Sequence, residues 1–180
     1  AKLKYAEVLG QTEETVKQTV RGILDKGEDV EQKVAKATKQ ATERALAQAH
    51  FSAEKVKKVA HTVISAAVES AEEAGANIAA VAKGAVQGTG DGISAAVEST
   101  RETLSSASEK SKVFLKADLA QTKEDLEAVE ELFLDVVRKV GDHSQDVAKE
   151  VASQTKETAA SLKAKAEDVS SWISRLLDRT

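Results

Sequence analysis

Apolar and small residues recur every eleven positions along most of this chain, and no proline interrupts them. Eleven residues fill three turns at about 3.67 residues per turn, so each row stays on one face of an α-helix. Without proline, no position forces a kink, and very long helices are possible. The pattern predicts an all-α protein of long amphipathic helices with 11-residue periodicity. One row contains Val30, Ala41, Ser52, Val63, Ala74 and Ala85, and another contains Ile93, Leu104, Leu115, Leu126 and Val137.

The composition favours thin, closely packed helices over a thick core. Hydrophobic residues make up 41% of the 180 residues, but aromatic residues make up only 3%. Alanine and valine dominate instead, and small side chains let helix axes approach to about 8 Å. We therefore expect an elongated antiparallel bundle that forms a single domain over residues 1–180.

Helix-ending and helix-starting residues divide the chain. Gly27 stands where a helix C-cap belongs, and Asp29 with Gln32 forms a capping-box pattern directly after it. Gly141 and Asp142 repeat this arrangement late in the chain. The helices predicted from these signals span residues 12–26, 29–87, 93–140 and 143–178.

The longest of these helices contains two weak points. Ser52 could act as the N-cap of a new helix, and Gly75 could interrupt the helix again. The continuing apolar row favours one helix through both positions, with a restart at either of them as the alternative.

A glycine cluster, GAVQGTGDG, occupies residues 84–92. Each glycine costs about 1 kcal/mol relative to alanine inside a helix, so the cluster predicts a turn at residues 88–92. Such a turn would bring the basic stretch 33–58 against the acidic stretch 122–147, and opposite charges favour that register. An uninterrupted rod, whose charges pair between molecules, is the alternative. The predicted turn or hinge positions are Gly27, Gly88, Gly90, Gly92 and Gly141.

Few residues suggest a catalytic or metal-binding site. The chain has no cysteine, which excludes disulfides and thiolate metal sites. His50 and His61 share a helix face but stand about 16 Å apart along the axis, too far to share a metal ion. Acidic residues on one ridge, Glu127, Glu131 and Asp135, are typical of a solvated face. We therefore expect no catalytic site, no metal and no cofactor.

Net charge and hydropathy limit the classes of partner that we expect. The formal net charge is −4, which does not favour general binding to nucleic acid. No apolar run approaches the roughly 18–20 residues that a membrane span needs, so no transmembrane segment is expected. The first residues, AKLKYAEVLG, lack the apolar core of a secretory signal. A cytoplasmic location is the corresponding expectation.

The end of the chain is its most hydrophobic amphipathic segment and the best candidate for an exposed interaction surface. This candidate surface consists of Val169, Trp172, Ile173, Leu176 and Leu177. The remaining apolar rows must also be buried, either against one another or against a partner.

The alanine-rich rows, and segments such as VAKEVASQTKETAASLKAKAEDV (147–169), resemble phasins, exchangeable apolipoproteins and late-embryogenesis-abundant-like proteins. The resemblance implies granule coating, lipid binding or protection during drying. The residues themselves favour a non-catalytic structural or interaction protein, an accessory or scaffold subunit with a protein partner or self-association. The alternative is a phasin- or apolipoprotein-like coat on a lipid or storage-granule surface.

Overall fold

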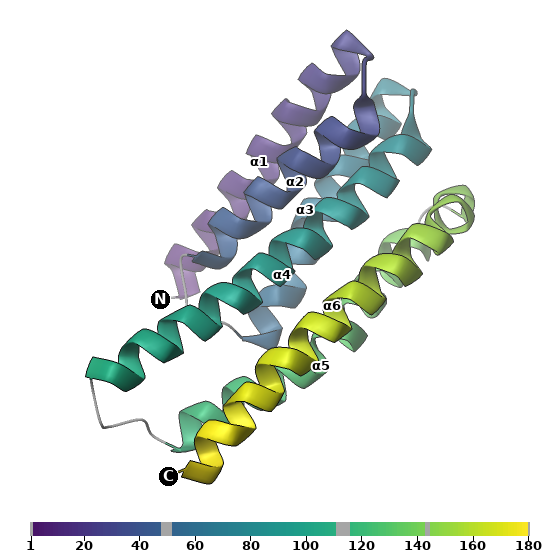
Figure 1. Ribbon diagram of the computed structural model, residues 1–180. Coiled ribbons are helices and arrows are strands. Elements are labelled where there is room, and N and C mark those ends of the chain that lie inside the picture. The colour runs from purple at the N-terminus through teal and green to yellow at the C-terminus, as the bar shows by residue number, and fades with distance from the viewer. Residues whose placement is uncertain (1, 48–51, 111–115, 143–144, 180) are drawn as a thin grey trace.

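The computed structural model describes residues 2–47, 52–110, 116–142 and 145–179, and this part of the chain forms a bundle of helices without strands (Figure 1). The all-α prediction is confirmed. The six helices are α1 (Lys2–Lys26), α2 (Val30–Ala47), α3 (Ala53–Ala74), α4 (Ile78–Lys110), α5 (Lys116–Asp142) and α6 (Gln145–Arg179).

The helices form two layers. The layer nearer the viewer in Figure 1 contains α2, α4 and α6, and the layer behind it contains α1, α3 and α5. Neighbours within a layer are in contact, as are the two helices of each pair α1–α2, α3–α4 and α5–α6. The molecule is therefore a stack of three helical hairpins.

Helices within a layer run parallel, which differs from the purely antiparallel arrangement that we expected. The ion pairs show this direction, because the residue numbers of the paired side chains increase together on the two helices. Between α1 and α3 the pairs are Lys17–Glu69 (3.2 Å) and Arg21–Glu73 (2.6 Å), and between α4 and α6 they are Glu98–Lys165 (2.8 Å) and Arg101–Asp168 (3.5 Å).

The long helix predicted for residues 29–87 is wrong, because the chain is divided near both weak points. Ser52 is the N-cap of α3: its backbone is extended, and its hydroxyl accepts a hydrogen bond from the Lys55 amide at 3.2 Å. Gly75 ends α3 in the left-handed conformation, with φ of 66°. The first apolar row is therefore distributed over α2, α3 and α4 rather than along one helix.

The loops after α1 and α3 share one backbone pattern. Gly27 and Gly75 both have φ of 66°, and two residues later Asp29 and Asn77 have φ of 49° and 55°. Glycine adopts this region without strain, and Asp and Asn enter it more readily than most other residues. The sequence Gly-x-Asp/Asn followed by Val or Ile marks both loops. The first was predicted as a helix boundary, whereas Gly75 was given only as a possible interruption.

The predicted glycine turn at residues 88–92 is also wrong. These residues lie inside α4, which runs without interruption from Ile78 to Lys110. Gly84, Gly88 and Gly92 occupy one face of that helix and lie directly against α2, where a Cβ atom would overlap the facing helix. The close contact with α2 offsets the helix-weakening effect of glycine, so the cluster serves packing rather than a turn.

Other boundaries shift as well. Residues 93–110 belong to α4 and residues 116–140 to α5, so the predicted helix 93–140 is wrong. The predicted register between the basic and acidic stretches is wrong, because it required the turn at residues 88–92. α3 nevertheless lies against α5, and Lys57 pairs with Asp135 at 3.8 Å. Gly141 belongs to α5, which ends one residue later, within the usual variation of helix ends.

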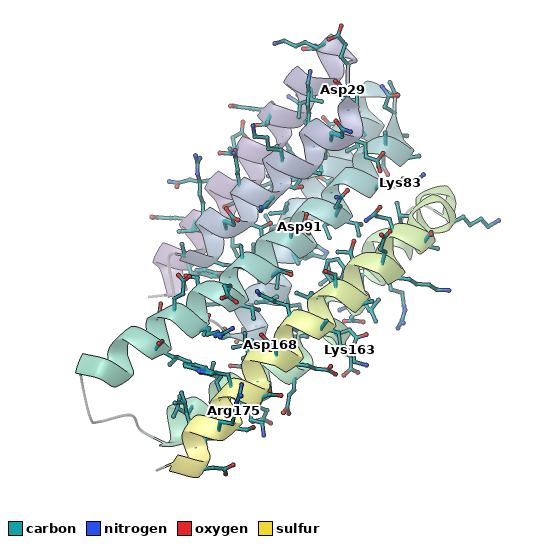
Figure 2. All side chains as sticks on the ribbon, in the orientation of Figure 1. Asp29, Lys83, Asp91, Lys163, Asp168 and Arg175 are labelled. Atoms are coloured by element: carbon teal, nitrogen blue, oxygen red, sulfur yellow. The ribbon has the colours of Figure 1, made fainter. Side chains whose placement is uncertain are left out.

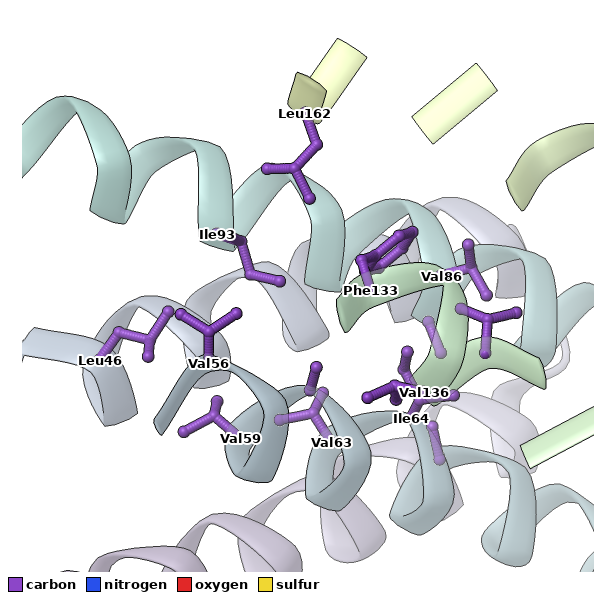
Figure 3. Close-up of a cluster of buried hydrophobic side chains, with 14 of the residues drawn as sticks. Leu46, Val56, Val59, Val63, Ile64, Val86, Ile93, Phe133, Val136 and Leu162 are labelled. Carbon is purple, nitrogen blue, oxygen red and sulfur yellow. The ribbon is translucent and has the colours of Figure 1, made fainter. Parts of the chain in front are cut away.

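The apolar rows converge on one core between the layers. Val16 and Val20 of α1 are spaced by four residues, share one helix face, and are both buried. Phe133 of α5 is the largest fully buried side chain, and it lies in a cluster with Ile64 and Ile93 (Figure 3). Within the described residues, no helix is long and apolar enough to cross a lipid bilayer.

Candidate interaction surfaces

The segment predicted as an interaction surface at the end of α6 is only partly exposed. Val169 and Ile173 are fully buried and belong to the core, so their assignment to an exposed surface is wrong. Trp172, Leu176 and Leu177 are half-buried. Residues spaced by three and four share a helix face, and the stack uses this face as core.

Trp172 is partly covered from α4. The guanidinium of Arg101 lies 5.9 Å from the centre of the indole ring, within the range of a cation–π contact. Arg101 also pairs with Asp168 of α6 and Glu98 of its own helix. The indole therefore helps to hold α4 against α6.

A groove runs along the outer side of the first hairpin, between α1 and α2. We call it the α1–α2 groove, and its volume is about 520 Å³. Its lining consists almost entirely of uncharged residues, most of them small, and the only charged side chains among them are Glu7 and Arg44. The uncharged residues are Val8, Gln11, Thr12, Thr15 and Thr19 of α1 with Ala37, Gln40, Ala41 and Ala45 of α2.

Two of the groove's threonines already satisfy their hydroxyl groups. Thr12 donates a hydrogen bond to the Val8 carbonyl, and Thr19 donates one to the Thr15 carbonyl, each at 2.7 Å. A buried hydroxyl is costly mainly when it lacks a hydrogen bond. These two threonines can therefore be covered by another apolar surface without losing a hydrogen bond to the protein.

The opposite end of the stack differs in charge. A groove of about 550 Å³ on the third hairpin, the α5–α6 groove, has five charged side chains in its lining. Ser170 donates a hydrogen bond to Glu127 across it at 3.3 Å. Charged and hydrogen-bonded side chains are typical of a terminal surface in contact with water. The five charged residues are Lys123, Glu127, Glu130, Lys163 and Glu167.

A third, shallower hollow spans the layer of α2, α4 and α6. Asp91 of α4 lies in it beside Lys39 of α2, and Asp168 borders it from α6 (Figure 2). Partial burial raises the pKa of Asp91, against the opposing effect of Lys39. A hydrogen bond from Lys165 lowers the pKa of Glu98, which fits its ion pair across the hollow. The charges here mainly pair with each other and tie α4 to α6.

Metal-binding residues do not converge in the described part of the chain. No group of three or more histidine, aspartate or glutamate side chains there could hold a metal ion. His61 is exposed on α3, whereas His50 and His143 lie outside the described residues. Lys139 and Lys57 both pair with Asp135, so this part of the predicted acidic ridge serves as an ion-pair partner.

Residues 7–177 match the family described as a family of unknown function, DUF6781. The chain belongs to that family. No curated protein and no solved structure matches it. Because the match spans nearly all of the chain, it includes both ends of the stack, and the α1–α2 and α5–α6 grooves lie within the family region.

The α1–α2 groove was missed from the sequence because the first helix was predicted to begin at residue 12. In the structure α1 begins at Lys2, which places Val8 on the same face as Thr12 and Thr15. The available signal was the spacing of Val8, Thr12, Thr15 and Thr19, which follows one helix face. Threonine is not counted as apolar in such patterns, so this uncharged face was not recognised.

Proposed function

We propose that this protein is a non-catalytic structural or interaction protein, an accessory or scaffold subunit that acts through its helix faces and associates with itself or with a protein partner. The main support is the uncharged α1–α2 groove at one end of a stack whose other end is charged. Stacked helical arrays normally end in polar outer faces, so the uncharged end is a surface suited to being covered.

The proposal is tested by measuring what the purified protein assembles with. Light scattering over a range of concentrations reports whether its mass increases, and purification under native conditions reports any partner held at fixed stoichiometry. A concentration-dependent mass or a stoichiometric partner is the expected result. A monomer at all concentrations, with no partner retained, contradicts the proposal.

A coat on a lipid or storage-granule surface is the second candidate. It is supported by the half-buried Trp172, Leu176 and Leu177 at the end of α6, which carry bulky apolar side chains suited to an interface. Trp172 is the only tryptophan, so its fluorescence reports this segment alone. A blue shift of its emission on adding anionic phospholipid vesicles supports the coat, and unchanged emission with saturating vesicles contradicts it.

A further inference from the structure

We infer that a second copy of this chain covers the α1–α2 groove, forming a symmetric dimer in which α1 of each copy packs against α2 of the other. The inference rests on the proposed function and goes beyond it by assigning both the surface and the partner. The result is a four-helix arrangement at the centre of the dimer, with the α5–α6 hairpins at its two outer ends.

The groove lies on the open end of the stack of hairpins. Each interior hairpin face is covered by the next hairpin: α3 and α4 cover one side of α1 and α2, and α5 and α6 cover the far side of α3 and α4. The first hairpin is covered on one side only, and its open side contains the groove. A second copy that presents the same hairpin extends the pattern already built into the molecule.

Water can be removed from much of this surface at low cost. Val8, Ala37 and Ala41 are half-buried already, and Thr12 and Thr19 make their hydrogen bonds within α1. Covering these five residues buries methyl groups and leaves the hydrogen bonds of the two threonines intact. The exposed side chains of Gln11, Thr15 and Gln40 then need hydrogen-bond partners from the second copy. Covering the α5–α6 groove would instead bury five charged side chains, so the cost of desolvation favours the α1–α2 groove.

The charges of the groove are self-complementary. Glu7 of α1 and Arg44 of α2 are the two charged residues of the groove lining, and they have opposite signs. Because consecutive helices are joined by a short loop, both residues lie toward the same end of the hairpin. A two-fold axis parallel to the helices places α1 over α2 of the other copy. Glu7 then lies about five residues, or roughly 8 Å, farther from the loop than Arg44 of the second copy, a separation that these two long side chains can span.

The surface is large enough for a dimer of moderate affinity. An 18-residue helix is about 27 Å long, and two helices side by side present a face roughly 20 Å wide, or about 550 Å² on each copy. This total of about 1,100 Å² lies just below the range of about 1,200–2,000 Å² for stable interfaces. We therefore expect dissociation in the micromolar range rather than an obligate dimer.

The test uses the full chain in sedimentation or light-scattering experiments between about 1 and 200 µM, a range centred on the expected micromolar affinity. The wild-type protein should change from monomer to dimer. Thr15→Arg places a bulky charge on an exposed position inside the groove, and it should weaken the dimer at least about tenfold. The matched control, Thr103→Arg, makes the same change on exposed α4 outside the described grooves and should leave the dimer unchanged.

A charge exchange tests the symmetry. Glu7→Arg and Arg44→Glu should each weaken the dimer, because like charges then meet across the axis. The double variant should dimerise again, and an equimolar mixture of the two single variants should form a mixed dimer. Circular dichroism and the unfolding midpoint should match those of the wild type, since both residues are at the surface.

The outcomes separate this inference from the broader proposal. A wild-type protein that remains monomeric at 200 µM overturns the inference, and so does a dimer that Thr15→Arg leaves unchanged. A different protein retained at fixed stoichiometry and lost in Thr15→Arg also overturns the second-copy assignment, but it supports the proposed function. Failure of the proposed function requires that neither a dimer nor a retained partner be found.

Discussion

Two helix pairs of this protein run parallel but are held together in different ways. Where α2 meets α4, Gly84, Gly88 and Gly92 lie against the backbone and small side chains of the facing helix. Where α1 meets α3, α1 contributes buried valines to the core and ion pairs cross the surface beside them. The first contact depends on the absence of side chains and the second on their presence.

The two contacts differ in how well they tolerate substitutions. A Cβ atom at Gly92 would lie 2.6 Å from Thr42 Cβ and 3.0 Å from the Lys39 carbonyl oxygen, so neither helix can yield without moving its backbone. The Thr38 hydroxyl donates to the Val34 carbonyl of its own helix at 2.7 Å and also lies 3.4 Å from the Gly84 carbonyl oxygen of α4, so it fits within the close approach. Side chains between α1 and α3 can instead adjust their rotamers, and exposed ion pairs can be lost at small cost.

The largest expected effect is at Gly88. A Cβ atom there would overlap the Ala35 carbonyl oxygen and the Thr38 hydroxyl. Gly88→Ala should lower the free energy of unfolding by about 3 kcal/mol, because overpacking outweighs the gain in helix propensity. Chemical denaturation monitored by circular dichroism measures the change.

Gly10→Ala is the matched control for Gly88→Ala. Gly10 lies in α1, and a Cβ atom there meets nothing within 4 Å. The same substitution should therefore raise the free energy of unfolding by about 0.5–1 kcal/mol through helix propensity alone. Equal effects at the two positions would mean that α2 and α4 are farther apart than described.

The next effect is in the core at α1. Val20 is fully buried, and Val20→Ala removes two methyl groups and leaves a small cavity. The free energy of unfolding should fall by about 2 kcal/mol, since the surrounding core side chains can close part of the space. Thermal unfolding at fixed protein concentration measures it. A change below about 0.5 kcal/mol would indicate that α1 packs only loosely on the bundle.

A smaller effect is expected for the ion pair between Arg21 and Glu73, which are separated by 2.6 Å and are both more than half exposed. A double-mutant cycle with Arg21→Ala and Glu73→Ala should give a coupling energy of about 0.2–1 kcal/mol that decreases in high salt. Val20→Ala, with no charge change, is the control for salt dependence. A coupling above about 2 kcal/mol would show that charge, rather than the valines, holds α1 to α3.

The smallest effect is a change in titration rather than in stability at neutral pH. Tyr5 donates a hydrogen bond to the Lys55 carbonyl at 3.4 Å, and partial burial raises the pKa of its hydroxyl to about 12 from 10.0. Because burial favours the protonated form, this contribution to stability is complete below pH 10 and is lost as the pH rises from about 10 through 12.

Tyr5 is the only tyrosine, so absorbance near 295 nm follows its ionisation directly. The midpoint should lie near 12 in the folded protein and near 10 in denaturant. Circular dichroism at each pH serves as the control for folding. A midpoint near 10 in a protein that remains helical would mean that the start of α1 does not pack on α3.

Residue patterns within one helix predicted the structure well. Gly27 stands directly after α1 with positive φ, and Val16 and Val20 are buried on one face of that helix. Ser52 caps α3 through its own hydroxyl, a signal that was visible but was outweighed by the continuing apolar row. The paired loops show the same: Gly75 and Asn77 repeat the pattern of Gly27 and Asp29 and were readable in principle.

The surfaces were harder to predict. Val169 and Ile173 have the hydrophobicity of an exposed binding segment, but α6 uses them in the core. Thr12 and Thr15 look polar in sequence, although they line an uncharged groove once α1 lies beside α2. Whether an amphipathic face is open depends on which other helix covers it, and that choice is made between segments far apart in the chain.

The sequence by itself determined the helical class. Its apolar residues follow helical spacing along most of the chain, and no proline interrupts them. Only the tertiary structure decided the role of the glycines in α4. The local cost of each glycine predicts a helix end, but the gain that outweighs it comes from α2, through backbone contacts that no local pattern contains. The same glycines therefore allow the close contact between α2 and α4 instead of a turn.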